Sequence, residues 1–97
     1  MAVVMFMEWD GVTAAQYDEV RKQVNWEGNV PPGGMFHVAA ITDQGLRVTD
    51  VWQSAEAFQT FVATRLMPGV KQVGVEGEPR VQIHPVHGLF TPAFKPV

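Results

Sequence analysis

The sequence predicts an α+β domain with two helices on one face of a four-stranded antiparallel sheet. Three observations lead to this prediction: four short runs rich in β-branched and aromatic residues, two stretches with helical periodicity, and their order β-α-β-β-α-β within 97 residues. That order is the ferredoxin-like plan. A chain of this length forms a single domain, which we place at residues 1–92, with a C-terminal tail at residues 93–97.

The first part of the chain is expected to form a buried strand and then a helix. The run Ala2–Trp9 (AVVMFMEW) is almost wholly apolar, as in a strand that is buried on both faces. Thr13 and Gln16 have the spacing of a capping box, which places the start of a helix at Thr13. This helix has an apolar stripe of Tyr17, Val20 and Val24. It ends near Trp26, before a loop that contains Pro31–Gly34 (PPGG).

A hairpin and a second helix are expected next. Met35–Thr42 and Leu46–Gln53 are β-rich runs on either side of a glycine-containing turn. Ser54 is placed to cap the following helix. The apolar stripe of that helix consists of Phe58, Phe61, Val62 and Leu66. Pro68-Gly69 is expected to end the helix or to kink it.

The last quarter of the chain is less regular. Val70–Gly77 fits either a short extra helical turn or a connecting segment. Arg80–His87 alternates enough for a final strand, and Pro85 favours an edge position or a bulge because it cannot donate a ladder hydrogen bond. The tail Gly88–Val97 contains two prolines and cannot be helical, so its aromatic side chains must pack on another surface.

Composition excludes several classes of partner and chemistry. The net charge is −3 and the seven basic residues form no cluster, which argues against binding to nucleic acid. The chain has no cysteine, and therefore no disulfide, zinc–thiolate site or thiol nucleophile. No apolar run approaches the about 20 residues of a membrane helix, and the first residues lack the basic region of a signal peptide. We expect a cytoplasmic protein with no membrane partner.

The predicted sheet leaves one face uncovered, because two helices can cover only one side. The other face would expose Met, Phe and Trp side chains from the strands, an apolar surface too large for a monomer. The charged fraction of 18% is also below the usual quarter, which points to a surface covered by a partner. We therefore expect a homodimer in which two sheets pack face to face.

His37 is the first candidate for acid/base chemistry, and its neighbour depends on the hairpin register. A four-residue Thr42–Gly45 loop would place His37 opposite Asp50, whereas a three-residue loop with a bulge at Gly45 would place it opposite Val51. In the first case Asp50 could orient His37 as a general base. The alternative is a structural hydrogen bond that holds the hairpin together.

No metal or organic cofactor is predicted. His84 and His87 are three residues apart, and on an extended strand this spacing puts the two rings on opposite faces. The sequence has no dense group of His, Asp and Glu, no glycine-rich nucleotide-binding motif and no serine-hydrolase motif.

Three segments of the chain resemble one known superfamily: Glu8–Thr13 before the first helix, Phe36–Ala39, and Asp50–Phe58 at the junction of a strand and a helix. They are similar to the dimeric α/β-barrel superfamily, which includes antibiotic-biosynthesis monooxygenase-like proteins and stress-responsive dimeric barrel proteins. The resemblance covers residues 1–92 and implies a ferredoxin-like dimeric barrel. The chain departs from the haem-degrading members, because it has no Asn in the first strand and no His in the second helix.

The resemblance implies a small cofactor-independent enzyme, monooxygenase-like or cyclase-like, that acts on a hydrophobic aromatic molecule. His37 is the expected acid/base group and Asp50 its orienting partner. Trp52 falls where the oxygenase-like members keep a cavity tryptophan. The expected substrate-binding residues are Trp52, Tyr17, Phe36 and His84. The alternative is a non-catalytic dimeric barrel protein of the stress-responsive or ligand-binding type, whose histidines are structural.

Overall fold

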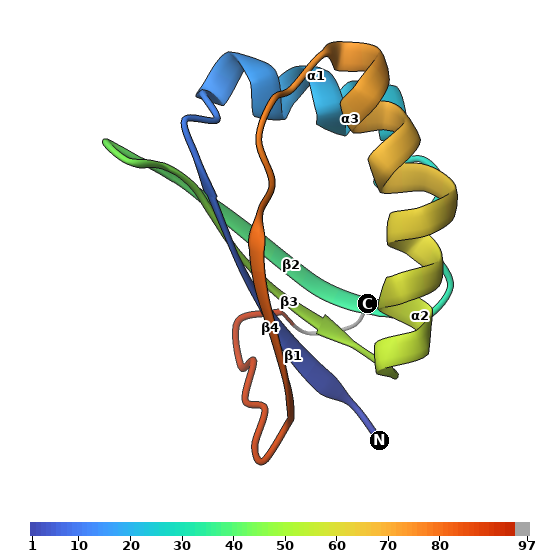
Figure 1. Ribbon diagram of the computed structural model, residues 1–97. Helices are drawn as coiled ribbons and strands as arrows, with labels where there is room; N and C mark the ends of the chain where they lie inside the picture. The colour runs from blue at the N-terminus through green and yellow to red at the C-terminus, as the bar shows by residue number, and fades with distance from the viewer. Residues whose placement is uncertain (95–97) are drawn as a thin grey trace.

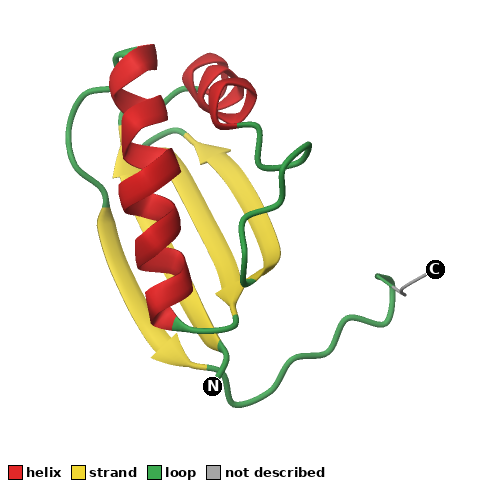
Figure 2. Ribbon diagram, turned by 90° about the vertical axis from the view of Figure 1, so that its right-hand side faces the viewer, coloured by secondary structure: helices red, strands yellow, loops and turns green. Residues whose placement is uncertain are grey.

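The computed structural model describes residues 1–94 and confirms the predicted order of elements (Figure 1). The strands are β1 (Val3–Asp10), β2 (Gly34–Thr42), β3 (Gly45–Trp52) and β4 (Arg80–Pro85). The helical elements are α1 (Ala14–Val24), α2 (Ala55–Phe61), the π-helical turn η1 (Val62–Leu66) and α3 (Met67–Val73). The antiparallel sheet has the order β2-β3-β1-β4, and all helices lie on one of its faces (Figure 2). This is the ferredoxin-like α+β fold.

The beginning of α1 is fixed by the predicted capping box. The Thr13 hydroxyl accepts a hydrogen bond from the Gln16 backbone N–H, and the Gln16 side chain accepts one from the Thr13 N–H. The helix ends at Asn25, whose φ of 56° is left-handed and turns the chain into the loop that precedes β2. Thus α1 is bounded at both ends by residues that satisfy free backbone groups.

The second helical segment continues past Pro68, so the expectation that Pro68-Gly69 could end the helix is wrong. Ser54 caps α2 as predicted, by accepting a hydrogen bond from the Ala57 N–H. A π-helical turn just before Pro68 shifts the hydrogen bonds of the helix by one residue, and this turn keeps the segment helical around a residue that has no N–H. The helix runs to Val73, so only the first part of Val70–Gly77 forms an extra turn.

Gly69 allows α3 to pass close to α1. A Cβ atom at this position would lie 2.5 Å from Cγ2 of Val24, which is shorter than any allowed contact. The two helices therefore approach at a point where one of them has no side chain, and Val24 and Val70 are both buried nearby.

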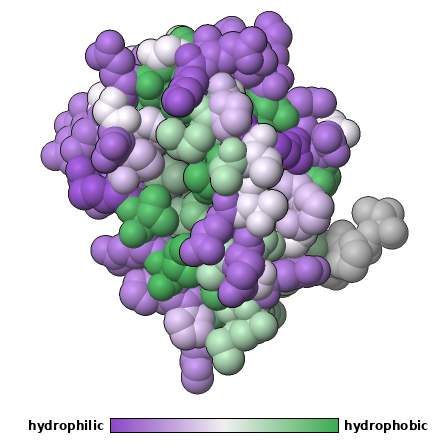
Figure 3. All heavy atoms as spheres, turned by 45° about the vertical axis from the view of Figure 1, so that its right-hand side comes forward, coloured by the Kyte–Doolittle hydropathy of each residue, from purple (hydrophilic) through white to green (hydrophobic). Residues whose placement is uncertain are grey.

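The core lies between the sheet and the helices. Side chains alternate along β1, so Met5, Met7 and Trp9 face the helices and are buried, whereas Phe6 points to the other face and is 44% exposed. Val38, also on the helix-free face, is 48% exposed. In the view of Figure 3, hydrophobic side chains form a band between hydrophilic regions.

β4 is an edge strand, as predicted from Pro85, but it ends at Pro85 and not at His87. Residues 88–94 are not helical, and the Phe94 ring packs 6.0 Å from the Phe36 ring. Phe90, by contrast, is 86% exposed, so the expectation that every tail aromatic packs is not met within this chain. Residues 95–97 of the predicted tail lie outside the described residues. Within residues 1–94, no helix has the length and apolar character needed to cross a membrane.

Candidate functional site

A cavity of about 260 Å³ lies between the sheet and the helices. Its walls are mainly apolar side chains from β1, β3 and the helical segment, including Met5, Met7, Trp52, Phe58, Phe61 and Val70. The volume is close to the lower end of the range for small-molecule sites. The cavity therefore suits one small hydrophobic molecule.

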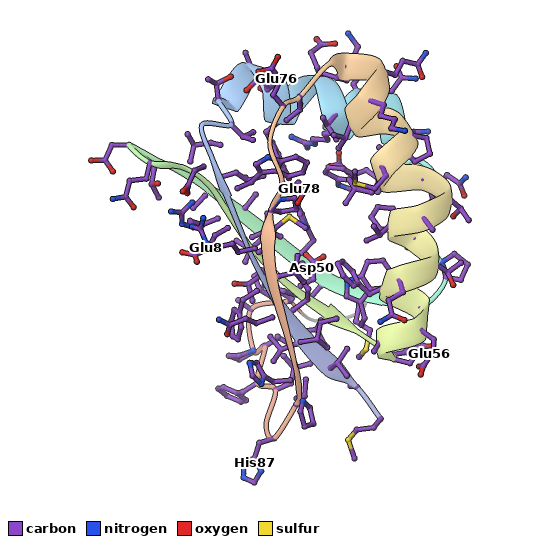
Figure 4. The ribbon with its side chains drawn as sticks, in the orientation of Figure 1. Glu8, Asp50, Glu56, Glu76, Glu78 and His87 are labelled. Atoms are coloured by element: carbon purple, nitrogen blue, oxygen red, sulfur yellow. The ribbon has the colours of Figure 1, made fainter. Side chains whose placement is uncertain are left out.

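Asp50 is the one buried charged residue among those described, with 6% of its surface exposed. Its Oδ1 atom lies 2.6 Å from Nδ1 of His37, and its Oδ2 atom accepts a hydrogen bond of 3.1 Å from the Trp52 indole N–H. Figure 4 shows Asp50 pointing from the sheet into the space under the helices. Both carboxylate oxygens are thus bound within the site, which explains how a carboxylate is accommodated in an apolar core.

The hairpin register brings these residues together. Thr42 pairs with Gly45, and counting back along both strands places His37 opposite Asp50. This is the first of the two registers that the sequence left open. Trp52 is two residues beyond Asp50, and alternation along β3 puts both side chains on the helix-facing side.

Tyr17 of α1 and Trp26 of the following loop flank the His37 ring, whose side chain is 33% exposed. The Tyr17 hydroxyl lies 2.7 Å from Nε2 of His37, and the two rings are parallel, with centroids 6.1 Å apart. The Trp26 ring is 5.3 Å from His37 and 5.8 Å from Tyr17. The imidazole is therefore held by hydrogen bonds at both nitrogens and by two aromatic rings.

The hydrogen-bond partners show which group donates and which accepts in the Asp50–His37–Tyr17 series. An ionised Asp50 can only accept, so the proton of a neutral His37 is on Nδ1. Nε2 is then an acceptor, and the Tyr17 O–H donates to it. Burial raises the pKa of Tyr17 above its usual value, against a smaller opposing effect of Arg21, so the hydroxyl is neutral in the resting site.

Arg65 fixes the loop that carries Trp26. Its Nη2 atom donates to the backbone carbonyl oxygens of Val24 (3.1 Å) and Asn29 (2.7 Å), and its guanidinium lies 5.6 Å from the centre of the Phe61 ring. These carbonyls belong to the end of α1 and the adjacent loop, so a helix C-terminus receives a positive charge. The same loop brings Trp26, Val30 and Pro31 to the cavity.

The structure does not bring all six predicted site residues together at the cavity. His37, Asp50, Trp52 and Tyr17 form one connected group at the cavity. Phe36 is next to the cavity in sequence and space, but it pairs with Val51 on the helix-free face of the sheet, and its ring packs against Phe94. Its predicted role in binding a substrate is therefore corrected.

His84 needs correction. It pairs with Val4 on β1, and its ring lies 6.3 Å from the Phe6 ring on the helix-free face of the sheet. It is therefore not part of the cavity. Successive residues of β4 point to opposite faces of the sheet. Ile83 pairs with Met5 and faces the helices, so its neighbour His84 faces the other side.

Trp26 was not among the predicted site residues. It stands just after the apolar stripe of α1, where an aromatic residue can still pack on the same face. The neighbouring Gly28 and prolines indicated only a loop, and nothing in their pattern showed that this loop folds back over His37.

Within residues 1–94, no group of three or more His, Cys, Asp or Glu residues is close enough to hold a metal ion. The ionisable pair at the cavity consists of His37 and Asp50 alone, with Tyr17 next to them. The site can therefore carry out proton transfer with its own side chains.

Comparison with known proteins identifies solved structures that share the fold of this chain. No family model matches the sequence, and no curated protein matches it either. Among solved structures, a protein of unknown function from Nitrosomonas europaea, NE2512, superposes with a TM-score of 0.72 at 14% identity, over 95% of each chain.

Two oxygenases of Streptomyces have the same fold. SnoaB of Streptomyces nogalater, a cofactor-independent oxygenase, has a TM-score of 0.60 at 14% identity, over 91% of this chain and 93% of its own. The monooxygenase ActVA-Orf6 of Streptomyces coelicolor, solved with the ligand nanaomycin D, has a TM-score of 0.59 at 17% identity, over 95% of this chain and 92% of its own. The chain thus has the fold of the antibiotic biosynthesis monooxygenase-like proteins, as its resemblance to the dimeric α/β-barrel superfamily predicted.

Proposed function

We propose that the protein is a small cofactor-independent enzyme, monooxygenase-like or cyclase-like, that acts on a hydrophobic aromatic molecule in the cavity. One observation carries the proposal: a hydrogen-bonded Asp50–His37–Tyr17 group borders an otherwise apolar cavity of about 260 Å³. An apolar cavity with a few convergent polar groups is the usual form of a small-molecule site. The shared fold with SnoaB, a cofactor-independent oxygenase, gives further support.

The chemistry begins with removal of a proton from a carbon that a carbonyl group of the substrate makes acidic, either directly or through a conjugated ring. His37 is the acid/base group of the site, and Asp50 fixes its tautomer and stabilises the imidazolium. In an oxygenase the resulting carbanion gives an electron to O2, and in a cyclase the enolate attacks another carbon of the same molecule. Trp52 and Tyr17 position the aromatic rings of the substrate.

The two Streptomyces neighbours favour the oxygenase form, so 9-anthrone is a suitable first probe. It is a neutral fused-ring ketone with an acidic C–H bond. We expect the protein to accelerate oxygen uptake by anthrone, measured with an oxygen electrode, and His37→Gln to lose about 10²–10⁴-fold of that rate. Anthrone binding without oxygen uptake would contradict the oxygenase form and leave the cyclase form. Failure to bind would contradict both.

A non-catalytic binding protein is the second candidate, because both nitrogens of His37 already have partners within the chain. A purely structural His37 would contribute to stability and not to turnover. A thermal melt of His37→Gln separates the two cases: a large fall in melting temperature, with unchanged reaction of anthrone, would favour the binding protein.

We also propose that two copies pair through the helix-free face of the sheet. The exposed apolar side chains Phe6 and Val38 support this arrangement, since a monomer would leave them in water. Sedimentation equilibrium at micromolar concentration is expected to give twice the mass of one chain. Val38→Glu should shift the equilibrium to the monomer, whereas Met67→Glu, an exposed position on α3, should not. A monomer mass for the unmodified protein would overturn the proposal.

A further inference from the structure

The side chains that border the cavity include three that can exchange a proton: Asp50, His37 and Tyr17. Asp50 uses one carboxylate oxygen for His37 and the other for Trp52. His37 uses Nδ1 for Asp50 and Nε2 for Tyr17. The imidazole therefore has no free nitrogen for a substrate, and Asp50, although its carboxylate oxygens could still accept, is only 6% exposed.

Tyr17 is the member of the group that is partly exposed and can still accept a hydrogen bond at its free lone pairs. Its hydroxyl donates its one proton to His37, and a phenolic oxygen that donates still has lone pairs with which it can accept. The oxygen is at the end of the hydrogen-bond chain, and the Tyr17 ring borders the cavity. We propose that the Tyr17 oxygen, and not His37, is the atom that takes the proton from the substrate, with His37 acting through it; this inference rests on the proposed function.

The step balances without any further reactant. A C–H bond next to the substrate carbonyl breaks and its electron pair stays on the substrate as an enolate. The proton forms a new O–H bond on Tyr17 while the original Tyr17 proton moves to Nε2 of His37. The imidazolium keeps its Nδ1 proton against the Asp50 carboxylate, so the positive charge forms next to a fixed negative one.

The surroundings of Tyr17 agree with a proton carrier that is neutral at rest. Burial raises the pKa of Tyr17, as do three nearby carboxylates, while Arg21 of the same helix opposes them. The three carboxylates are Glu27 of the loop, Asp50 of β3 and Asp18 of α1. A standing tyrosinate is therefore disfavoured, and the hydroxyl transfers one proton as it receives another.

Hydrogen–deuterium exchange of 2-tetralone tests the inference. This small neutral ketone has an exchangeable CH2 group between its ring and its carbonyl. In D2O without oxygen, NMR follows the loss of that proton signal, so the assay measures proton removal alone. We expect the unmodified protein to accelerate exchange, and Tyr17→Phe to lose about 10²–10⁴-fold of the acceleration.

The opposite mechanism makes the opposite prediction for the same variant. If His37 contacts the substrate directly, Tyr17→Phe frees Nε2, and exchange should stay equal or become faster. That result would overturn the inference. Thr64→Val is the matched control, because it removes a hydroxyl on η1 that bonds to the Thr60 carbonyl away from the cavity. This variant should accelerate the exchange of 2-tetralone as much as the unmodified protein does.

Two further measurements separate the possible failures. Quenching of tryptophan fluorescence by 2-tetralone is expected to give the same affinity, within twofold, for the unmodified protein and Tyr17→Phe, since Phe keeps the ring. Tight binding with exchange that does not depend on Tyr17 overturns this inference alone. An unmodified protein that neither binds 2-tetralone nor accelerates its exchange overturns the proposed function and this inference together.

Discussion

Truncation of Phe61 to alanine is expected to lower the free energy of unfolding by about 3–5 kcal/mol. Phe61 is 8% exposed and its ring lies 5.3 Å from that of Trp52 and beneath the Arg65 guanidinium. The substitution removes both contacts and enlarges the adjacent cavity, which the surrounding helices cannot fill. Chemical denaturation followed by tryptophan fluorescence should show a lower midpoint with an unchanged slope.

Phe90→Ala is the matched control for this prediction. It makes the same change in side chain at a position that is 86% exposed, so its effect should stay within about 0.5 kcal/mol. Both variants must be measured at one protein concentration, because pairing of two copies would add to apparent stability. An unchanged midpoint for Phe61→Ala would mean that this face of α2 does not pack on the sheet.

The fold could be predicted because its signals are local. The Thr13–Gln16 capping box, the Ser54 cap and the apolar stripes are each contained within a few residues, and the structure has all of them. The behaviour at Pro68 could not be predicted in the same way. A π-helical turn depends on how the helix packs, and the sequence indicated only that proline disturbs a helix.

The site was predictable only as far as strand alternation allows. The sequence indicates His37 and Asp50 as a possible pair, but a difference of one residue in the hairpin turn decides whether the two residues are opposite each other. The same alternation places His84 on the helix-free face of the sheet, away from the cavity. The contact of Tyr17 with His37 is a tertiary contact between α1 and β2, and no spacing in the sequence encodes it.

Arg65 shows a different limit of sequence reasoning. Its place beside the apolar stripe of the second helical segment suggests a solvated flank. In the structure it instead bonds to carbonyl oxygens of Val24, Asn25 and Asn29, which are 36 to 41 residues away in the chain. Free carbonyls at a helix end attract a guanidinium, yet the sequence does not show which helix end will be near.

Asp50→Asn is expected to reduce proton abstraction by about 10²–10⁴-fold with only a modest loss of stability. The carboxylate accepts hydrogen bonds from two donors, the Nδ1–H of His37 and the indole N–H of Trp52. An amide of the same shape has one acceptor oxygen and one donor NH2 group. If the oxygen keeps Trp52, the NH2 group faces His37 and forces its proton from Nδ1 to Nε2. The imidazole then donates to Tyr17 and can no longer receive a proton from it.

Nitrogen NMR of the His37 ring reports this change directly, because the two tautomers have different nitrogen shifts. The exchange rate of 2-tetralone in D2O reports its consequence. Asp43→Asn, the same substitution in the exposed turn between β2 and β3, should leave both unchanged. An Asp50→Asn variant that keeps its exchange rate within a few-fold while its tautomer changes would show that His37 takes no part in proton transfer. A loss of rate with the tautomer unchanged would instead assign to Asp50 the stabilisation of the imidazolium, because the neutral amide cannot balance a positive charge.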